Sequence, residues 1–129
     1  MLSPMDPDLT GFSPAQQHAL LELLILAMFA DGQLTTAEDP QLQPLFAALG
    51  QTDATDRQNV FAAAVTRLRP YAQSLFKAKD QALLLMGNFT DRRQQKTVSE
   101  AVQKRMDVNH HVTSWENTLL MELRLKFHL

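Results

Sequence analysis

Two short segments of the chain carry oxygen-bearing side chains at spacings that could bind a hard cation. The first is Asp31-Gly32-Gln33-Leu34-Thr35-Thr36-Ala37-Glu38, and the second runs from Asn109 to Glu116. Asp31 and Glu38 of the first segment, and Asn109 and Glu116 of the second, are the candidate ligands. Ca²⁺ and Mg²⁺ prefer carboxylate and amide oxygens. A divalent cation, Ca²⁺ or Mg²⁺, is therefore the one cofactor that these residues indicate.

The residues before the first segment exclude an EF-hand. Asp31, Gly32 and Glu38 match the back half of an EF-hand loop, whose front half would place acids at positions 27 and 29. Ala27 and Phe29 stand there instead. A cation bound here would therefore have few protein ligands.

The two glutamates have a second explanation that needs no ligand. Thr35-x-x-Glu38 and Thr113-x-x-Glu116 both have the form of a capping box, in which the glutamate bonds back to the start of its helix. Asp31 fits this explanation less well, because it falls at the end of a helix, where a carboxylate is disfavoured by about 0.3–1 kcal/mol. A turn formed by Asp31 and the glycine after it is the alternative.

No other arrangement of residues indicates catalysis or zinc binding. The chain has no cysteine, which excludes thiol catalysis and cysteine-based zinc sites. His110 and His111 are adjacent, and no third ligand stands at a spacing typical of zinc sites. The four scattered glycines form no phosphate-binding loop. We therefore expect a protein that is not an enzyme.

Helical periodicity predicts the elements that would position these residues. Ser13 and Gln16 have the spacing of a capping box, with a proline suited to the first turn between them. The helix that follows is expected to end near Ala30. It should form the buried centre of the fold, because Glu22 is its only polar residue from Leu20 onward.

Five further helices are expected, and no segment alternates like a strand. Their ranges are Thr35 or Thr36 to Gly50, Asp53 or Thr55 to Pro70, Tyr71 to Asn88 with a break near Lys79-Asp80, Arg92 to Asp107, and Ser114 to Phe127. The prediction is an all-α fold, a single-domain bundle of about six helices. Residues 1–12 should form a flexible arm, which leaves residues 13–129 as the helical domain.

The two acidic segments belong to a longer internal repeat with an offset of 78 residues. Thr35 falls on Thr113 and Glu38 on Glu116, and the apolar positions of the flanking helices keep their register. We therefore expect two helix-loop-helix units related by a pseudo-twofold axis. Chance agreement between two amphipathic helix pairs is the alternative.

Charge is distributed unevenly along the chain. Residues 1–56 contain eight Asp or Glu and no Lys or Arg, whereas residues 57–105 contain ten Lys or Arg and three Asp or Glu. Either these segments pack together and neutralise each other, or the polarised charge binds a protein partner or a second copy in a homo-oligomer. The basic segment lacks the interleaved aromatic residues of single-strand nucleic-acid binders, so no nucleic acid is expected.

Hydropathy gives no sign of a membrane segment. The longest apolar run, residues 23–30, has eight residues, whereas a membrane-spanning helix needs about 20. The first residues also lack the pattern of a signal peptide. We expect a cytoplasmic protein with no membrane association.

The junction Ala30-Asp31-Gly32-Gln33-Leu34-Thr35-Thr36-Ala37-Glu38, between an apolar helix and a leucine-striped one, resembles the TerB-like tellurite-resistance family. That family is an all-helical bundle with an A-D-G-x-[IVL]-[ST]-x-x-E junction. The resemblance covers residues 18–50 and, more loosely, residues 96–129. It implies a non-enzymatic role in tellurite or metal-stress response, with a cation held by Asp31 and Glu38 at the first junction and by Glu116 at the second. In the second junction Asn109-His110 replaces Asp-Gly, which loses one carboxylate.

Overall fold

A computed structural model of the chain describes residues 9, 11–31, 36–107 and 114–128, and this part is helical with no strand. Its elements are α1 (Pro14–Asp31), α2 (Gln43–Ala48), α3 (Ala54–Leu68), the 3₁₀-helix η1 (Tyr71–Gln73), α4 (Leu75–Met86), α5 (Arg92–Asp107) and α6 (Ser114–Phe127). The predicted all-α bundle of about six helices is confirmed. No described helix is long and apolar enough to cross a membrane.

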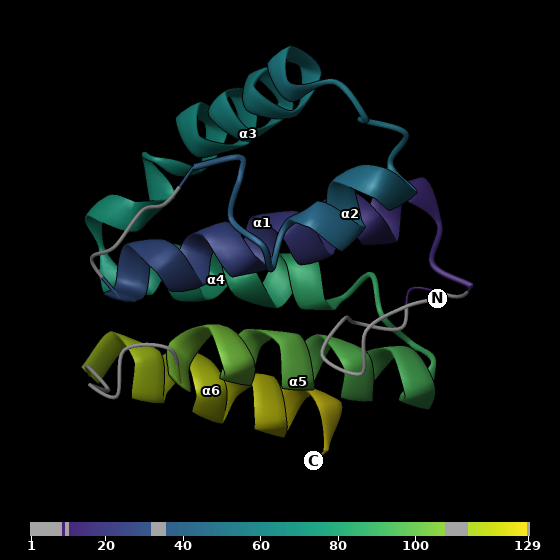
Figure 1. Cartoon of the computed structure of the whole chain (residues 1–129). Helices are drawn as coiled ribbons and strands as arrows, with labels where there is room; N and C mark the ends of the chain where they lie inside the picture. The colour runs from purple at the N-terminus through teal and green to yellow at the C-terminus, as the bar shows by residue number, and fades with distance from the viewer. Residues whose placement is uncertain (1–8, 10, 32–35, 108–113, 129) are drawn as a thin grey trace.

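Helix α1 is the centre of the bundle, as its sequence predicts. Every residue from Leu20 to Met28 is buried, and α1 packs against each of the other five α-helices. Figure 1 shows α3 on one side of α1, and α5 and α6 on the other. An apolar helix that must be covered on all sides explains why the remaining helices arrange themselves around it.

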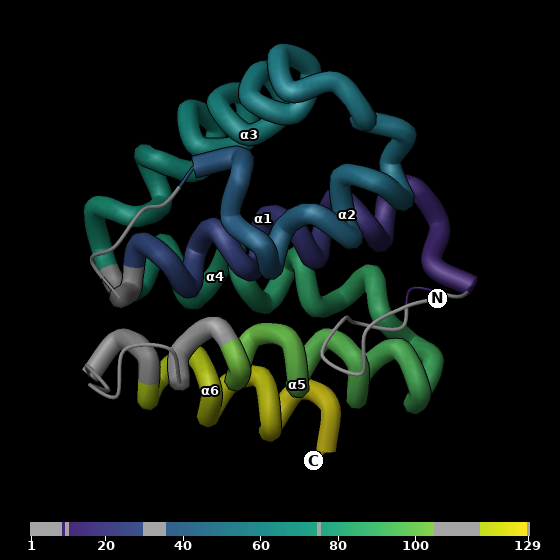
Figure 2. The backbone as a smooth tube through the Cα atoms, viewed as in Figure 1, coloured from purple at the N-terminus to yellow at the C-terminus, as the bar shows by residue number. Residues whose placement is uncertain are grey.

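Four of the helices form two antiparallel pairs, α1 with α2 and α5 with α6, and the first helix of each pair runs in the same direction. In Figure 2 the chain runs along α1 and returns along α2, then later runs along α5 in the direction of α1 and returns along α6. This arrangement has the form expected for two helix-loop-helix units related by a pseudo-twofold axis. The loops within the two pairs include residues 32–35 and 108–113, which lie outside the described residues.

Contacts at the start of α1 and α5 support the repeat. The Ser13 hydroxyl accepts a hydrogen bond from the Gln16 N–H (3.1 Å), and the Asp91 carboxylate accepts one from the Gln94 N–H (3.3 Å). Gln16 also closes the predicted capping box by accepting from the Ser13 N–H (2.9 Å). Gln16 and Gln94 are 78 residues apart and exchange side-chain hydrogen bonds of 2.9 and 3.2 Å. A reciprocal contact between equivalent residues is what a twofold axis produces.

Helix α2 begins later than predicted. We expected a helix from Thr35 or Thr36, but residues 36–42 form turns and the helix begins at Gln43. Pro40 has no N–H to donate, and it disfavours helical backbone at Asp39. The Asp39 carboxylate instead accepts from the Gln41 N–H at 2.9 Å, which stabilises a turn.

A second boundary also differs from the prediction. The break expected near Lys79-Asp80 is absent from α4, which is continuous there, and it lies instead at Ser74. Ser74 has extended backbone, and its hydroxyl caps α4 by accepting from the Lys77 N–H. A serine in this conformation ends one helical segment and starts the next. The other helices have the boundaries predicted for them to within about two residues.

The last residues of the predicted arm belong to the core. Phe12 is 8% exposed and lies against Phe89, with 5.7 Å between the ring centroids. Leu9 is partly buried against the same core, and its carbonyl accepts from the Phe12 N–H. The rest of the arm, residues 1–8 and 10, lies outside the described residues.

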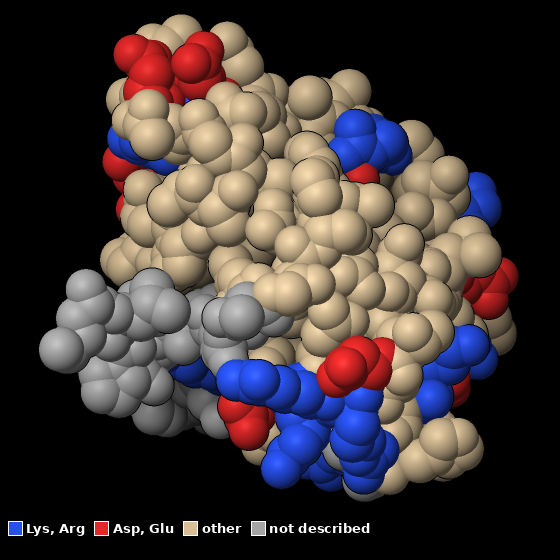
Figure 3. Space-filling model, turned by 90° about the vertical axis from the view of Figure 1, so that its right-hand side faces the viewer, with Lys and Arg blue, Asp and Glu red and all other residues tan. Residues whose placement is uncertain are grey.

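Packing neutralises part of the uneven charge. Two ion pairs, Glu22–Arg67 and Glu38–Arg57, join the acidic first segment to the basic second one. In the face seen in Figure 3, Lys and Arg gather most densely in the lower part of the molecule, where Figure 1 places α5 and α6. The expected neutralisation therefore occurs between α3 and the acidic segment, and it leaves a basic surface elsewhere.

Candidate functional site

Glu38 is the one predicted ligand whose side chain belongs to the described part of the chain. Asp31 is the last residue of α1, and Glu116 is the third residue of α6. The side chains of both, and the whole of Asn109, lie outside the described residues. The cation site predicted from these four residues therefore stays a prediction.

Glu38 lies in a turn and not at the start of a helix. The Thr36 hydroxyl accepts from the Glu38 N–H (3.3 Å), and the Thr36 carbonyl accepts from the Asp39 N–H (3.1 Å). Ala37, between them, is fully buried. The capping-box prediction for Glu38 is wrong, because α2 begins five residues further along the chain.

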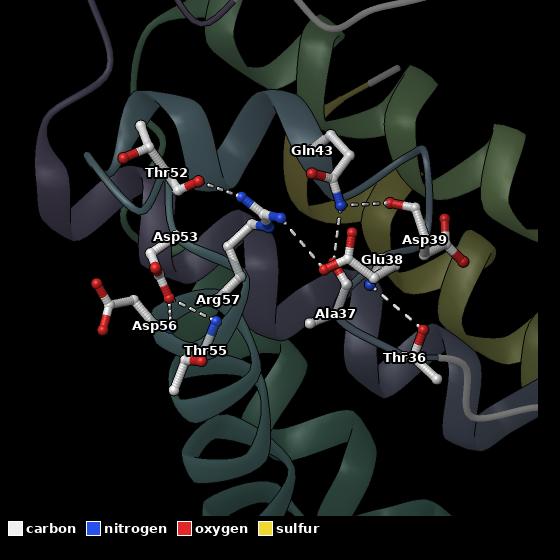
Figure 4. A network of polar contacts seen from close by, with 10 residues as sticks. All are labelled: Thr36, Ala37, Glu38, Asp39, Gln43, Thr52, Asp53, Thr55, Asp56 and Arg57. Atoms are coloured by element: carbon white, nitrogen blue, oxygen red, sulfur yellow. Dashed lines mark hydrogen bonds and ion pairs between the residues drawn. The ribbon is translucent and has the colours of Figure 1, made fainter.

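The partner of Glu38 is an arginine from α3. Arg57 Nη2 lies 3.3 Å from Glu38 Oε1, and Arg57 Nη1 donates to the Thr52 carbonyl at 2.6 Å (Figure 4). The Arg57 side chain is 16% exposed, whereas that of Glu38 is 60% exposed. A largely buried guanidinium thus supplies the positive charge beside Glu38, and a metal ion there would have to compete with it.

The acids near Glu38 are engaged in local structure. The Asp53 carboxylate caps α3 by accepting from the Thr55 N–H (2.7 Å) and the Asp56 N–H (3.3 Å), as Figure 4 shows. The carboxylate of Asp39 stabilises the turn before α2. In the described ranges, no three His, Asp or Glu side chains come together in a group that could hold a metal ion. The geometry around Glu38 supports a structural role for it.

Two glutamines complete the attachment of the turns before α2. Gln43 Nε2 donates to the Ala37 carbonyl at 2.8 Å, and Gln41 Nε2 donates to the Ala101 carbonyl of α5 at 2.8 Å. Together with Glu38–Arg57, these bonds connect residues 36–43 to α3 and α5. The network contains hydrogen-bonding and charged groups, but no nucleophile paired with a base that would indicate catalysis.

Glu22 has a structural role that the sequence analysis did not assign. It is buried in α1, and Arg67 of α3 donates to its carboxylate from Nε at 2.6 Å and also contacts it through Nη2. A buried carboxylate requires such a partner. The signal for this pair was present in the sequence, since Glu22 is the only charge within the apolar part of α1.

The outer surface of α4 and α6 carries large apolar side chains that no described residue covers. Phe76 and Leu84 of α4 are 76% and 72% exposed, and Met121 and Leu125 of α6 are 61% and 64% exposed. The two helices pack against each other. We call these four residues the α4/α6 face.

Helical spacing separates this face from the core. On α6 the buried stripe is Leu119, Leu123 and Phe127, and Met121 and Leu125 lie off it. An ion pair between Lys79 and Glu122, at 3.6 Å, holds α4 and α6 together at the edge of the face. The helical period of 3.6 residues accounts for the buried stripe, but it does not decide whether apolar residues on the opposite side are covered.

Comparison with known protein families, curated proteins and solved structures finds none that matches this chain.

Proposed function

We propose that this chain is a non-enzymatic helical domain that binds another protein chain through the α4/α6 face. The observation that carries the proposal is the exposure of Phe76, Leu84, Met121 and Leu125 on two packed helices. Burying one such side chain is worth about 1.5–3 kcal/mol. Large apolar side chains exposed on neighbouring helices are typical of interaction sites.

The acidic residues support the same proposal by having structural partners. Glu22 binds Arg67, and Glu38 binds Arg57. The carboxylate of Asp53 caps α3. These described acids serve the fold, whereas the exposed apolar face is a feature of the surface that has no role within the fold.

A photo-crosslinking amino acid tests the proposal in cells that naturally express the protein. Placed at Phe76 or Leu125, the probe should give discrete crosslinked species, which mass spectrometry can identify. Gln58 and Ala63, exposed on α3, are matched control positions and should give none. Equal crosslinking from both surfaces, or no crosslinking from positions 76 and 125, would contradict the proposal.

The TerB-like resemblance motivates a second proposal, a divalent cation held by Asp31 and Glu38. Its specific support is the position of Asp31 as the last residue of α1, where a carboxylate needs a positive partner. Ca²⁺, Mg²⁺, Mn²⁺ and Zn²⁺ should then raise the melting temperature of the wild type but not of Asp31→Ala. Because Arg57 competes for Glu38, Arg57→Gln should strengthen binding. Equal melting temperatures with and without every ion would reject the site.

A further inference from the structure

We infer that the α4/α6 face is covered by a second copy of this chain, in a twofold dimer. The inference rests on the proposed function, which requires only that some protein covers this face. It is carried by three observations: the relative position of α4 and α6, the charges beside the apolar residues, and the amount of apolar surface exposed.

The Lys79–Glu122 ion pair indicates which parts of the two helices lie beside each other. Both run in the same direction (Figure 1), and the 3.6 Å contact between Lys79 Nζ and Glu122 Oε1 brings these two residues into the same region of the helix pair. Because a helix rises about 1.5 Å per residue, Asp80 and Arg124 both lie within one helical turn of this ion pair, on α4 and α6 respectively. Asp80 is negative and lies on α4, whereas Arg124 is positive and lies on α6.

Both charged residues adjoin the apolar side chains. Asp80 is four residues from Phe76 and from Leu84, on the same side of α4. Arg124 is three residues from Met121 on α6. Asp80 and Arg124 are both exposed, and neither forms an ion pair within the described part of the chain.

A twofold axis parallel to the helices makes this face self-complementary. Rotation about this axis places α4 of one copy against α6 of the other, and each residue keeps its position along the helix direction. Asp80 then meets Arg124 of the second copy, and the symmetry repeats the pair on the other side of the apolar centre. An axis perpendicular to the helices at the level of Asp80 would instead bring Asp80 towards Asp80, which like-charge repulsion disfavours.

The apolar area fits a dimer of ordinary size. The four residues are 61–76% exposed, and together they expose roughly 500 Å² of apolar surface, which is in the range of about 300–600 Å² typical of functional patches. A standard interface buries about 800 Å² from each partner, of which somewhat more than half is apolar. The face therefore supplies about the apolar area that such a dimer needs, with Asp80 and Arg124 beside its apolar residues.

Sedimentation analysis of the full chain tests the inference. The wild type should sediment as a dimer, whereas Phe76→Glu and Leu125→Glu should be monomers that keep the wild-type circular dichroism spectrum. Ala63→Glu on α3 is the matched control and should remain a dimer. A monomeric wild type, or a Phe76→Glu variant that still dimerises, would overturn the inference.

Charge reversal tests the pairing itself. Asp80→Arg and Arg124→Asp should each weaken the homodimer about tenfold to a hundredfold, because each replaces two opposite-charge pairs by two like-charge pairs. An equimolar mixture of the two variants should form a heterodimer about as stable as the wild type, since both of its pairs are again of opposite charge. No recovery in the mixture would overturn the pairing. A monomeric chain that still crosslinks from position 76 to another protein would overturn the dimer and leave the proposed function standing.

Discussion

At the scale of single residues, Glu38 and Arg57 show how a charge can serve the fold while resembling a ligand. Arg57 is largely buried and is held by Glu38 and the Thr52 carbonyl. Glu38 is mostly exposed, so water and salt screen its attraction to Arg57. Exposed ion pairs are worth about 0.2–1 kcal/mol, and this pair belongs in that range.

A double-mutant cycle measures this interaction. We expect Glu38→Gln and Arg57→Gln to show a coupling energy of about 0.2–1 kcal/mol in the free energy of unfolding, followed by urea denaturation. Asp56→Asn is the control partner for Arg57→Gln, because Asp56 is a neighbouring exposed acid, and that pair should show no coupling. A coupling of zero between positions 38 and 57 would contradict the ion pair.

The pair formed by the buried Glu22 carboxylate and the half-exposed Arg67 side chain predicts a larger effect of different form. Arg67→Ala leaves the Glu22 carboxylate buried without a partner, and we expect it to lower the free energy of unfolding by about 1–3 kcal/mol. The double substitution Glu22→Leu/Arg67→Met removes both charges and should recover most of that loss. Thermal denaturation of the three proteins compares them. A double variant no more stable than Arg67→Ala would contradict this account, because it removes the unpaired charge and methionine replaces the arginine stem.

At the scale of the elements, the end of α2 depends on one backbone conformation. Gly50 has a φ of +79°, and its N–H donates to the Ala47 carbonyl while the Gln51 N–H donates to the Phe46 carbonyl. This pair of bonds is a Schellman motif, which favours glycine because a side chain makes the left-handed conformation unfavourable.

Gly50→Ala should therefore destabilise the protein by about 1–2 kcal/mol. A Cβ at Gly50 would meet no atom within 4 Å, so the loss would come from the backbone alone. Gly50→Asn is the matched control and should lose less, because asparagine tolerates this conformation. Urea denaturation of the three proteins measures the difference, and an alanine variant as stable as the wild type would contradict it.

Local signals explain why most elements could be predicted from the sequence. The capping residues Ser13 and Gln16 fix the start of α1, and Asp53 fixes that of α3, because each acts on a backbone only two or three residues away. Thr35-x-x-Glu38 misled the prediction because a capping-box spacing is no guarantee of a helix. Pro40, which lies beyond that spacing, decides the local conformation.

The contacts of the candidate site could not be predicted from helical periodicity, because they join residues that are far apart in the sequence. Glu38 and Arg57 are 19 residues apart and meet only because α3 folds back towards the turns before α2. Likewise, the buried stripe of α6 follows from its period of 3.6 residues. Whether Met121 and Leu125 on the other side are covered depends on the remaining elements, which lie elsewhere in the chain.

At the scale of the whole molecule, the uneven charge of the sequence becomes an attraction between parts of the fold. Glu22 and Glu38 belong to a segment without Lys or Arg, and their partners, Arg57 and Arg67, both lie on α3. The apolar contacts of α3 with α1 are therefore supplemented by ion pairs near both of its ends. Attraction between partly exposed charges weakens as salt shortens the Debye length, from about 30 Å at 0.01 M to about 3 Å at 1 M.

The stability of the bundle should accordingly fall as salt increases. In the Phe76→Glu background, which removes the inferred dimer, raising NaCl from about 0.01 M to about 0.5 M should lower the free energy of unfolding by about 0.5–1 kcal/mol. Adding Glu22→Gln and Glu38→Gln should abolish most of this dependence. Adding Gly50→Ala instead should lower stability but keep the dependence, because it leaves both ion pairs in place. Equal salt dependence in all three proteins would show that the ion pairs of α3 do not carry the effect.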